Sequence, residues 1–440
     1  MKQLYITIMA GLFLNYAGAQ DDLNELIKKE VNSSTPFYTE VYKDLHLNPE
    51  LSQQEFRTSK KMQQELLALG FEVTMNVGGN SLVGVYKNGN GPVIMMRTDM
   101  DALPILEKTG LPFASTVKAK NIDGITVPVM HACGHDMHMS VFLSTANALV
   151  KLKRKWSGTL VFIAQQAEEG SNGADRMISD GLFKRFPKPN YIMAYHVSST
   201  LPSGTIGYCI GPTFACVTSV DIIFKGVGGH GAYPEKTIDP IVMASRAVLD
   251  FQTIVSRELL PLDPAVVTVG SINGGFQYNI IPDEVKMQLT IRTYKDEVRE
   301  HILEAIRRIS KHIALSARMP EDNLPEVTIL KDPTPPVINN EALVMKAVAS
   351  YRNIIGESNV TEVPPAMVAE DFGRYGLTEE KIPIFMTWLG AVSPEKISIA
   401  KKEGSELPPL HSPFFVPDTE VTMKTGALAM TRAIIDLMKI

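Results

Sequence analysis

Four short apolar runs, each bounded by glycine or proline, constrain the fold of this chain more than any other feature. Their continuous hydrophobicity is typical of strands buried on both faces, as in α/β proteins. Amphipathic helical patterns lie between them and predict helices packed on one face of a sheet. The runs are Val93–Arg97, Leu160–Ala164, Tyr191–Tyr195 and Ile384–Trp388, and the helical patterns include Thr58–Leu69, Met139–Leu152 and Glu420–Met438.

Residues with reactive side chains follow these runs at the point where each strand is expected to end. Asp99 and Asp101 follow the first run, Glu168 and Glu169 the second, and His196 the third. Open α/β sheets bind their ligands in a crevice at the carboxyl ends of the strands. The sequence therefore predicts a functional site at this edge.

The middle of the chain has a different rhythm. It predicts, in order, strand Val220–Lys225, helix Pro240–Ser256, strands Ala265–Ser271 and Val285–Thr293, helix Glu297–Leu315 and strand Glu326–Leu330. This β-α-β-β-α-β order is the ferredoxin-like pattern. We expect an inserted domain at 213–331 between two parts of one catalytic domain, 20–212 and 332–440, with the proline-rich stretch Asp332–Pro336 as a linker.

The stretch His131–His138 holds three imidazoles, a thiol and a carboxylate, a density that suggests bound metal. Further along the chain come Glu168, Glu169, His196 and His411. One plausible ligand set is Cys133, His135, Glu169, His196 and His411. Five ligands are too many for one tetrahedral ion with an open position, but they suit two ions about 3.5–4 Å apart. Zn²⁺ is the expected metal, with Mn²⁺, Co²⁺ or Ni²⁺ as alternatives.

Each of these residues also has a structural interpretation. Paired glutamates are often a solvated turn, His196 could be a hydrogen-bonded core histidine, and His411 could be a loop residue. His138 is left out of the ligand set because its structural interpretation is that it opens the following helix. Adjacent glutamates can point in different directions, so Glu169 could bind metal while Glu168 acts as a general base. The metal interpretation depends on the whole set.

The net charge of −5 is spread without blocks of like charge. This pattern argues against a nucleic-acid track or a basic membrane patch and favours small soluble substrates. The three cysteines, an odd number, cannot all form disulfides.

The N-terminus is typical of a signal peptide. Lys2 precedes the apolar run Leu4–Leu14, and the small residues Ala17–Ala19 form a cleavage site before Gln20. We expect removal of residues 1–19 and export to the periplasm or the medium. The alternative is an ordinary buried first helix. No other run reaches transmembrane length.

Six ordered motifs extend over most of the chain: Asp99–Pro104, His131–Asp136, Gln166–Gly170, Gly228–Ala232, Glu370–Phe372 and Leu410–Pro413. Together they resemble the zinc aminoacylase and carboxypeptidase superfamily of di-metal peptidases, specifically its amidohydrolase branch, which includes hippurate hydrolases and indole-acetyl-amino-acid hydrolases. The resemblance implies a mixed-sheet α/β catalytic domain. It also implies that the ferredoxin-like insertion is a lid that carries a homodimer interface.

The resemblance further implies roles for the candidate ligands. Cys133 would bridge the two metal positions, His135 and His196 would complete one, and Glu169 and His411 the other. Glu168 would activate water.

The resemblance assigns supporting roles to other residues. Asp101 would support the metal centre, and Asp99 would not be a ligand. His230 in the lid would stabilise the tetrahedral intermediate, in its own or the partner's site. Asn279 and Arg292 would contact substrate, and an arginine suits a carboxylate because its fork donates two hydrogen bonds.

Two departures from the family pattern stand near the site. Gln166 replaces the usual proline before the Ala-Glu-Glu triplet, and Thr98 stands where alanine is common. The loop Val197–Gly204 lacks the usual short motif, which leaves the acyl preference open.

These features predict hydrolysis of N-acyl amino acids to a carboxylate and a free amino acid, with Glu168 taking the proton of the attacking water. Three alternatives remain. One is a dipeptidase or carboxypeptidase with the same site. Another is a Cys133 nucleophile paired with a histidine base. The third is a non-catalytic protein that binds metal or ligand on this fold.

Overall fold

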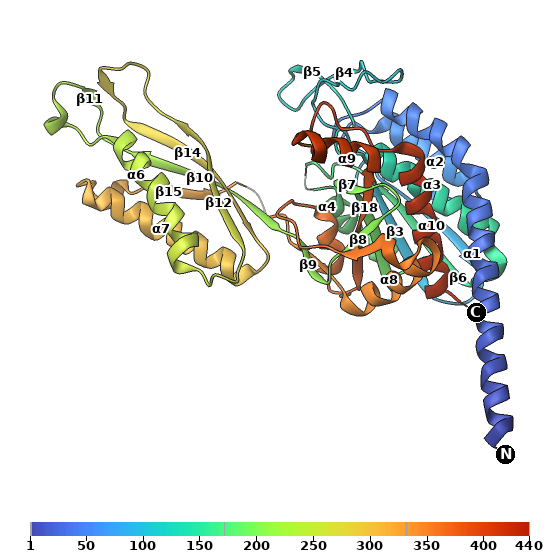
Figure 1. Cartoon of the computed structure of the whole chain (residues 1–440). Coiled ribbons are helices and arrows are strands. Elements are labelled where there is room, and N and C mark those ends of the chain that lie inside the picture. The colour runs from blue at the N-terminus through green and yellow to red at the C-terminus, as the bar shows by residue number, and fades with distance from the viewer. Residues whose placement is uncertain (1, 171, 331–332, 440) are drawn as a thin grey trace. The chain divides into compact units, whose positions relative to one another are not determined.

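The computed structural model describes the backbone of residues 2–170, 172–330 and 333–439, and side chains from residue 22 onward within those ranges. The chain forms two compact units (Figure 1). The first comprises Met1–Gly211, Ile338–Pro364 and Arg374–Ile440, and the second comprises Pro212–Val337 and Pro365–Gly373. The predicted signal peptide, residues 1–19, lies outside the residues whose side chains are described.

The first unit is built on a mixed sheet of eight strands, in the order β1-β2-β6-β3-β7-β18-β8-β17. Its centre is parallel, because β3 pairs in parallel with β6 and β7, and β7 pairs in parallel with β18. The strands are β1 (Glu72–Met75), β2 (Leu82–Asn88), β3 (Val93–Asp99), β6 (Gly158–Gln165), β7 (Tyr191–Pro202), β8 (Ile206–Tyr208), β17 (Val360–Glu362) and β18 (Ile384–Val392). All four predicted apolar runs are therefore central strands.

Four helices pack against one another and form one core with the sheet (Figure 1). They are α1 (Lys2–Leu47), α3 (His135–Lys151), α8 (Glu341–Ile355) and α10 (Thr419–Leu437). The period of two is visible in β6, where Leu160 and Phe162 join this core and the buried Val161 between them points to the other face. Among the described residues, no helix combines the length and hydrophobicity needed to cross a bilayer.

Helix α3 departs from the amphipathic pattern predicted for it. It begins at His135, and 14 of its 17 residues are buried. The reason is that α3 lies among α1, α10 and the strands β3 and β7, so it has no solvated face.

The remaining helices and strands of the first unit are α2 (Phe56–Ala68), β4 (Lys118–Lys120), β5 (Thr126–Pro128), α4 (Gly173–Ser179), α5 (Leu182–Arg185) and α9 (Pro394–Glu403). The short pair β9 (Gly211–Phe214) and β16 (Val337–Asn339) falls at the unit boundary.

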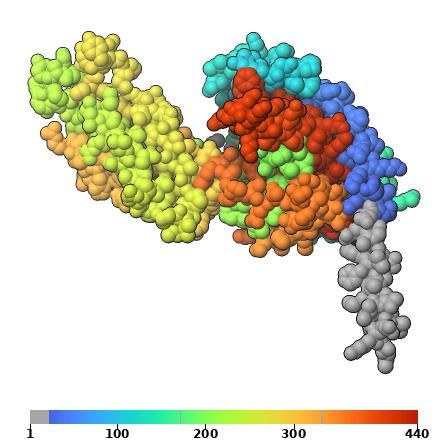
Figure 2. All heavy atoms as spheres, viewed as in Figure 1, coloured from blue at the N-terminus to red at the C-terminus, as the bar shows by residue number. Residues whose placement is uncertain are grey.

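The second unit has the predicted ferredoxin-like order. Its elements are β10 (Cys216–Lys225), α6 (Pro240–Thr253), β12 (Ala265–Asn273), β14 (Glu284–Thr293), α7 (Asp296–Ser316) and β15 (Glu326–Ile329). The sheet order is β12-β14-β10-β15, with antiparallel pairing throughout. Both helices contribute to one apolar core with this sheet. At one end of the unit β11 (Gly229–His230) pairs with β13 (Ile280–Ile281), and the two loops lie side by side on the surface (Figure 1, Figure 2).

The segment Pro365–Gly373 belongs to the second unit, whereas the sequence placed it within the second part of the catalytic domain. The physical reason is a pair of backbone hydrogen bonds. The N–H of Ala366 donates to the carbonyl of Thr213 at 2.9 Å, and the N–H of Ala215 donates to the carbonyl of Val368 at 2.9 Å. Such long-range pairing leaves no periodic signal in the sequence.

His46, in the last turn of α1, joins that helix to the start of α3. Its Nδ1 lies 2.6 Å from Oδ2 of Asp136, and its Nε2 lies 3.0 Å from Oε1 of Glu107. Burial lowers the pKa of His46, but hydrogen bonds and charge from the two carboxylates outweigh burial and raise the pKa to about 10. The protonated imidazole therefore donates to both carboxylates.

The contribution of His46 to stability should depend on pH. Its pKa is about 10 when folded and 6.5 ordinarily. Stabilisation is therefore complete below pH 6.5 and is lost as the pH rises toward 10. We expect His46→Gln to lower the free energy of unfolding by about 3 kcal/mol at neutral pH, because two buried carboxylates lose their cation. That deficit should shrink toward high pH.

Denaturant unfolding of both proteins between pH 6.5 and about 9.5 measures the effect. The control is His312→Gln, which alters an exposed imidazole bonded to the carbonyl of Arg308. A deficit of His46→Gln that stays constant across this range would contradict the proposed charge state.

Candidate metal centre

The carboxyl ends of β3, β6 and β7 bring the predicted site residues together, because these strands are parallel neighbours. Asp99 is the last residue of β3, and Glu168 and Glu169 follow the end of β6. The prediction that His196 follows its strand is wrong. Strand β7 continues to Pro202, so His196 lies inside it, paired with Trp388 of β18.

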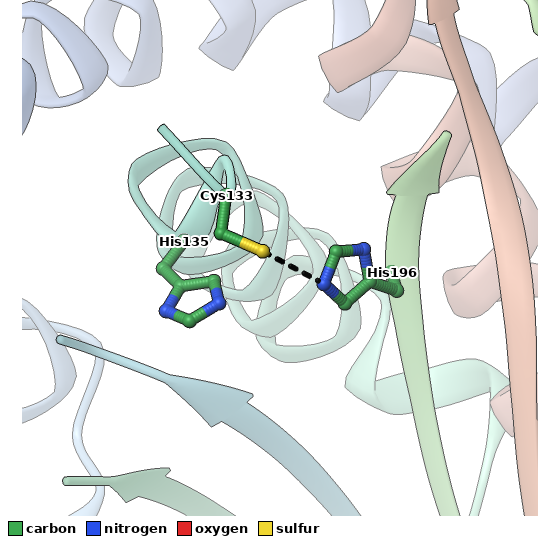
Figure 3. A group of neighbouring side chains, drawn as sticks. All are labelled: Cys133, His135 and His196. Atoms are coloured by element: carbon green, nitrogen blue, oxygen red, sulfur yellow. Dashed lines mark hydrogen bonds between the residues drawn. The ribbon is translucent and has the colours of Figure 1, made fainter. Parts of the chain in front are cut away.

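Cys133 and His135, at the start of one helix, lie beside His196 of a central strand (Figure 3). Cys133 precedes α3, His135 begins it, and His196 comes from β7. The Sγ atom of Cys133 lies 3.4 Å from Nε2 of His196, and one donor atom from each of the three residues lies within 4.8 Å of the others. All three side chains are buried, so the cluster is a candidate first metal position.

Cys133 also belongs to a second cluster with Glu169 and His411. Nε2 of His411 lies 3.3 Å from Sγ of Cys133 and 3.3 Å from Oε1 of Glu169. The N–H of His411 donates to the carbonyl of Ala132 at 2.9 Å, which ties the C-terminal loop to the loop before α3. Sγ of Cys133 is thus common to both clusters, as a bridging ligand would be.

Hydrogen bonds to carbonyls set the tautomers of two candidate ligands. Nδ1 of His135 lies 2.7 Å from the carbonyl of Asp101, and Nδ1 of His196 lies 2.8 Å from the carbonyl of Val197. A carbonyl only accepts, so each Nδ1 carries a hydrogen, and in the neutral ring that binds metal the lone pair is then on Nε2. This is the arrangement that orients metal-binding histidines in proteins.

The donor set fits divalent metal. Nε2 of His135 is buried and has no hydrogen-bond partner, which is costly for a polar atom unless a ligand satisfies it. Burial raises the pKa of Cys133, and the nearby charges of Glu169 and Glu168 raise it further. Divalent cations would reverse that balance by stabilising the thiolate and the carboxylates together. The residues therefore suit a soft and borderline cation site.

Asp101 holds the loop that follows β6. Its Oδ1 accepts the N–H of Glu168 at 3.1 Å, and its Oδ2 accepts the N–H of Glu169 at 3.0 Å. Oδ2 also accepts the hydroxyl of Ser52 at 2.5 Å. Together with the carbonyl bond to His135, these contacts connect Asp101 to both clusters without requiring it to bind metal.

Glu168 is buried beside the first cluster. Its Oε2 lies 3.9 Å from Nε2 of His135, and Glu168, Glu169 and His135 form a further group with metal-compatible spacing. A carboxylate at this position could accept a proton from water at the cluster.

His138, which the ligand prediction omitted, joins a buried network below the first cluster. Its Nδ1 lies 2.7 Å from Oδ1 of Asp99, and its Nε2 accepts the N–H of Val197 at 2.9 Å. Nδ1 is therefore the donor. The other oxygen of Asp99 accepts from Arg97 at 2.7 Å.

Asp99, His135 and His138 also have donor atoms close enough to form a metal group. However, the contacts of His138 to Asp99 and Val197 occupy both ring nitrogens and favour a supporting role. The sequence does carry one signal for a role of His138 near the centre. It lies three residues after His135, and residues three apart on a helix share a face.

Two sequence features near the site have local explanations. Gly134 has φ +81°, and a Cβ there would lie 2.6 Å from Cγ2 of Val197, so only glycine fits between Cys133 and His135. Gln166, where the family pattern has proline, donates its backbone N–H to the hydroxyl of Ser81 at 3.0 Å. Proline would lack that donor.

His230, Asn279 and Arg292 all lie in the second unit. The N–H of Ala232 donates to Nδ1 of the exposed His230 at 3.0 Å, which leaves the hydrogen on Nε2. Nη1 of Arg292 donates to the carbonyl of Met367 at 2.6 Å. The carbonyl of Asn279 accepts the N–H of Gly231 at 2.8 Å.

Comparisons with known proteins agree with the fold and with a metal-dependent hydrolase. Residues 95–409 match the model of peptidase family M20/M25/M40. The chain is 36% identical to thermostable carboxypeptidase 2 of Saccharolobus solfataricus over 93% of this chain and 97% of that protein. It is 38% identical to hippurate hydrolase of Campylobacter jejuni over 77% of this chain and 84% of that protein.

A crystal structure of a dinuclear metal-binding peptidase of the M20 family from Bacillus subtilis is also similar. It superposes with a TM-score of 0.74 at 29% identity, over 92% of this chain and 99% of that one. The family match spans well over half of the sequence, and the thermostable carboxypeptidase matches nearly end to end. The chain is therefore a hydrolase of peptidase family M20/M25/M40.

Proposed function

We propose that this enzyme hydrolyses the amide bond of N-acyl amino acids and releases a carboxylate and a free amino acid. The observation that carries the proposal is the convergence of five candidate ligands in two groups that share Cys133, with Glu168 beside them. The name of one relative described above, hippurate hydrolase, refers to hippurate, which is an N-acyl amino acid.

Cys133, His135 and His196 would hold one divalent cation, and Cys133, Glu169 and His411 a second. When bound, the two cations would polarise the scissile carbonyl and acidify water, with Zn²⁺ as the expected metal and Mn²⁺, Co²⁺ or Ni²⁺ as alternatives. Asp101 would keep His135, Glu168 and Glu169 in place through the contacts described above.

Glu168 would act as the general base. Its carboxylate would take a proton from the attacking water as the new C–O bond forms, and would then deliver that proton to the leaving nitrogen as the C–N bond breaks. Nε2–H of His230, from this subunit or a partner, would donate to the oxyanion. Arg292 and Asn279 would bind the substrate's carboxylate and carbonyl region.

The second candidate function is a carboxypeptidase or dipeptidase that uses the same residues. It is supported by the 36% identity to a thermostable carboxypeptidase over nearly the whole chain. The two functions share the bond broken and differ in the group on its acyl side. An amino acid residue there carries a free or blocked amine, whereas an acetyl or benzoyl group carries none.

Turnover should require divalent metal and should favour acyl over aminoacyl substrates. We expect about two metal ions per chain, loss of activity after chelation, and recovery when Zn²⁺ or Mn²⁺ is returned. Metal analysis by mass spectrometry and a panel of N-acetyl amino acids, N-benzoyl amino acids and free dipeptides test this.

Faster cleavage of dipeptides would favour the second candidate function. Full activity in chelator would instead indicate a Cys133 nucleophile, and stoichiometric metal without any turnover would indicate a binding protein.

Replacement of the proposed base should abolish turnover but leave the metal in place. We expect Glu168→Gln to lower kcat by about 10²–10⁴-fold, because the amide cannot accept the proton. Steady-state kinetics and metal content measure the two effects separately. The control is Glu72→Gln, which alters an exposed glutamate of β1 in the same unit. Retention of full turnover by Glu168→Gln would rule out this base.

We further propose export after removal of residues 1–19 and a homodimer formed through the second unit. Export is supported by the N-terminal charge and apolar pattern. The dimer is supported by exposed apolar side chains in the second unit, including Val242, Leu249 and Phe276.

Native mass spectrometry of the protein recovered outside the cytoplasm tests both proposals. We expect a subunit that starts at Gln20 and an assembly of two subunits; an intact N-terminus or a monomer would refute the respective proposal.

A further inference from the structure

The turn Gln166–Glu169 determines where the two adjacent glutamates point. Within it three consecutive backbone N–H groups donate to buried carboxylates. The N–H of Ala167 donates to Oε1 of Glu55 at 2.8 Å, and those of Glu168 and Glu169 donate to Asp101 at 3.1 and 3.0 Å. The turn is thus held from two sides by residues distant in sequence.

Ala167 has an unfavourable backbone conformation that requires support. Its φ is +50°, in the left-handed region that is unfavourable for a residue with a Cβ. A hydrogen bond to a carboxylate is stronger than one between neutral groups and offsets that cost. Loss of the bond would leave a strained residue directly before the two glutamates.

The strained turn directs the glutamates to different partners. Oε2 of Glu168 lies 3.9 Å from Nε2 of His135, whereas Oε1 of Glu169 lies 3.3 Å from Nε2 of His411. A shift of the turn would move both carboxylates at once. A group that fixes the position of Ala167 therefore also fixes the positions of the proposed base and of a candidate ligand.

Glu55 is well placed to be a rigid support. Its side chain is fully buried at the N-cap of α2. Its Oε1 also accepts the N–H of Gln53 at 2.9 Å, and its Oε2 accepts from Nδ2 of Asn80 at 3.3 Å. The bonds from Gln53 and Asn80 therefore hold the carboxylate in addition to the bond from Ala167.

We propose that Glu55 is a positioning residue that holds the Ala167 turn and thereby aims Glu168 and Glu169 at the metal centre. The inference rests on the roles proposed above for these two glutamates. Glu55 itself neither binds metal nor touches substrate in this proposal.

The first test compares Glu55→Ala with Glu50→Ala. Glu50 is a matched control because its side chain accepts the N–H groups of Arg57 and Thr58 at the start of α2 and is not bonded to the turn. Both variants should lower Tm. Glu55→Ala alone should weaken metal binding about 10–100-fold in a chelator competition and lower kcat by a similar factor, with KM within about threefold of wild type.

Two conservative variants keep the test decisive if Glu55→Ala does not fold. Glu55→Gln retains an acceptor oxygen at full reach, and it suits the site because burial and the charge of Asp101 raise the pKa of Glu55 to about 7. Glu55→Asp keeps the charge but withdraws it from Ala167. We expect Glu55→Gln to restore metal affinity and kcat to within about threefold of wild type, and Glu55→Asp to remain impaired.

The outcomes separate this inference from the proposed function. Unchanged metal affinity in Glu55→Ala, or an active Glu55→Asp beside an impaired Glu55→Gln, would overturn the positioning role. A wild-type enzyme that binds metal but turns over no acyl or peptide substrate would overturn the proposed function, while the metal-affinity comparison would still decide the role of Glu55.

Discussion

The rest of the centre depends on the hydrogen bonds that Asp101 accepts from backbone N–H groups. Its carboxylate accepts from Glu168 and Glu169, and its carbonyl accepts from His135. One residue, two positions after the end of β3, therefore fixes groups from α3 and from the loop after β6. Because Asp101 is buried, these bonds are shielded from water and hold the geometry firmly.

The concentration of buried acid explains why so much of the surrounding structure is polar. Asp99 is neutralised by Arg97 and also accepts a hydrogen bond from the neutral His138, and Asp136 is neutralised by His46. An unpaired buried carboxylate is costly, and Asp99 and Asp136 each have a cationic partner. Glu168 and Glu169 gather negative charge beside the Cys133 thiol, which is the condition under which divalent cations bind well.

The elements that the sequence predicted most accurately have strong local patterns. The runs at β3 and β7 were identified because strands buried on both faces are continuously apolar. The amphipathic pattern wrongly predicted a solvated face for α3, since its burial on every side depends on α1 and α10. The sequence did not predict the supporting contacts of His138 and Glu55 for a similar reason. Their partners lie far away in the sequence.

The sequence by itself determined the α/β class, the ferredoxin-like order of the second unit and the candidate ligands. Hydrophobic period and the density of donor side chains are local properties that survive in one dimension. Only the tertiary structure decided that Cys133 is common to two clusters and that Glu55 and Asp101 hold the turn before Glu168. Those facts depend on parallel strands that bring their carboxyl ends to one edge, and on distances that no local pattern encodes.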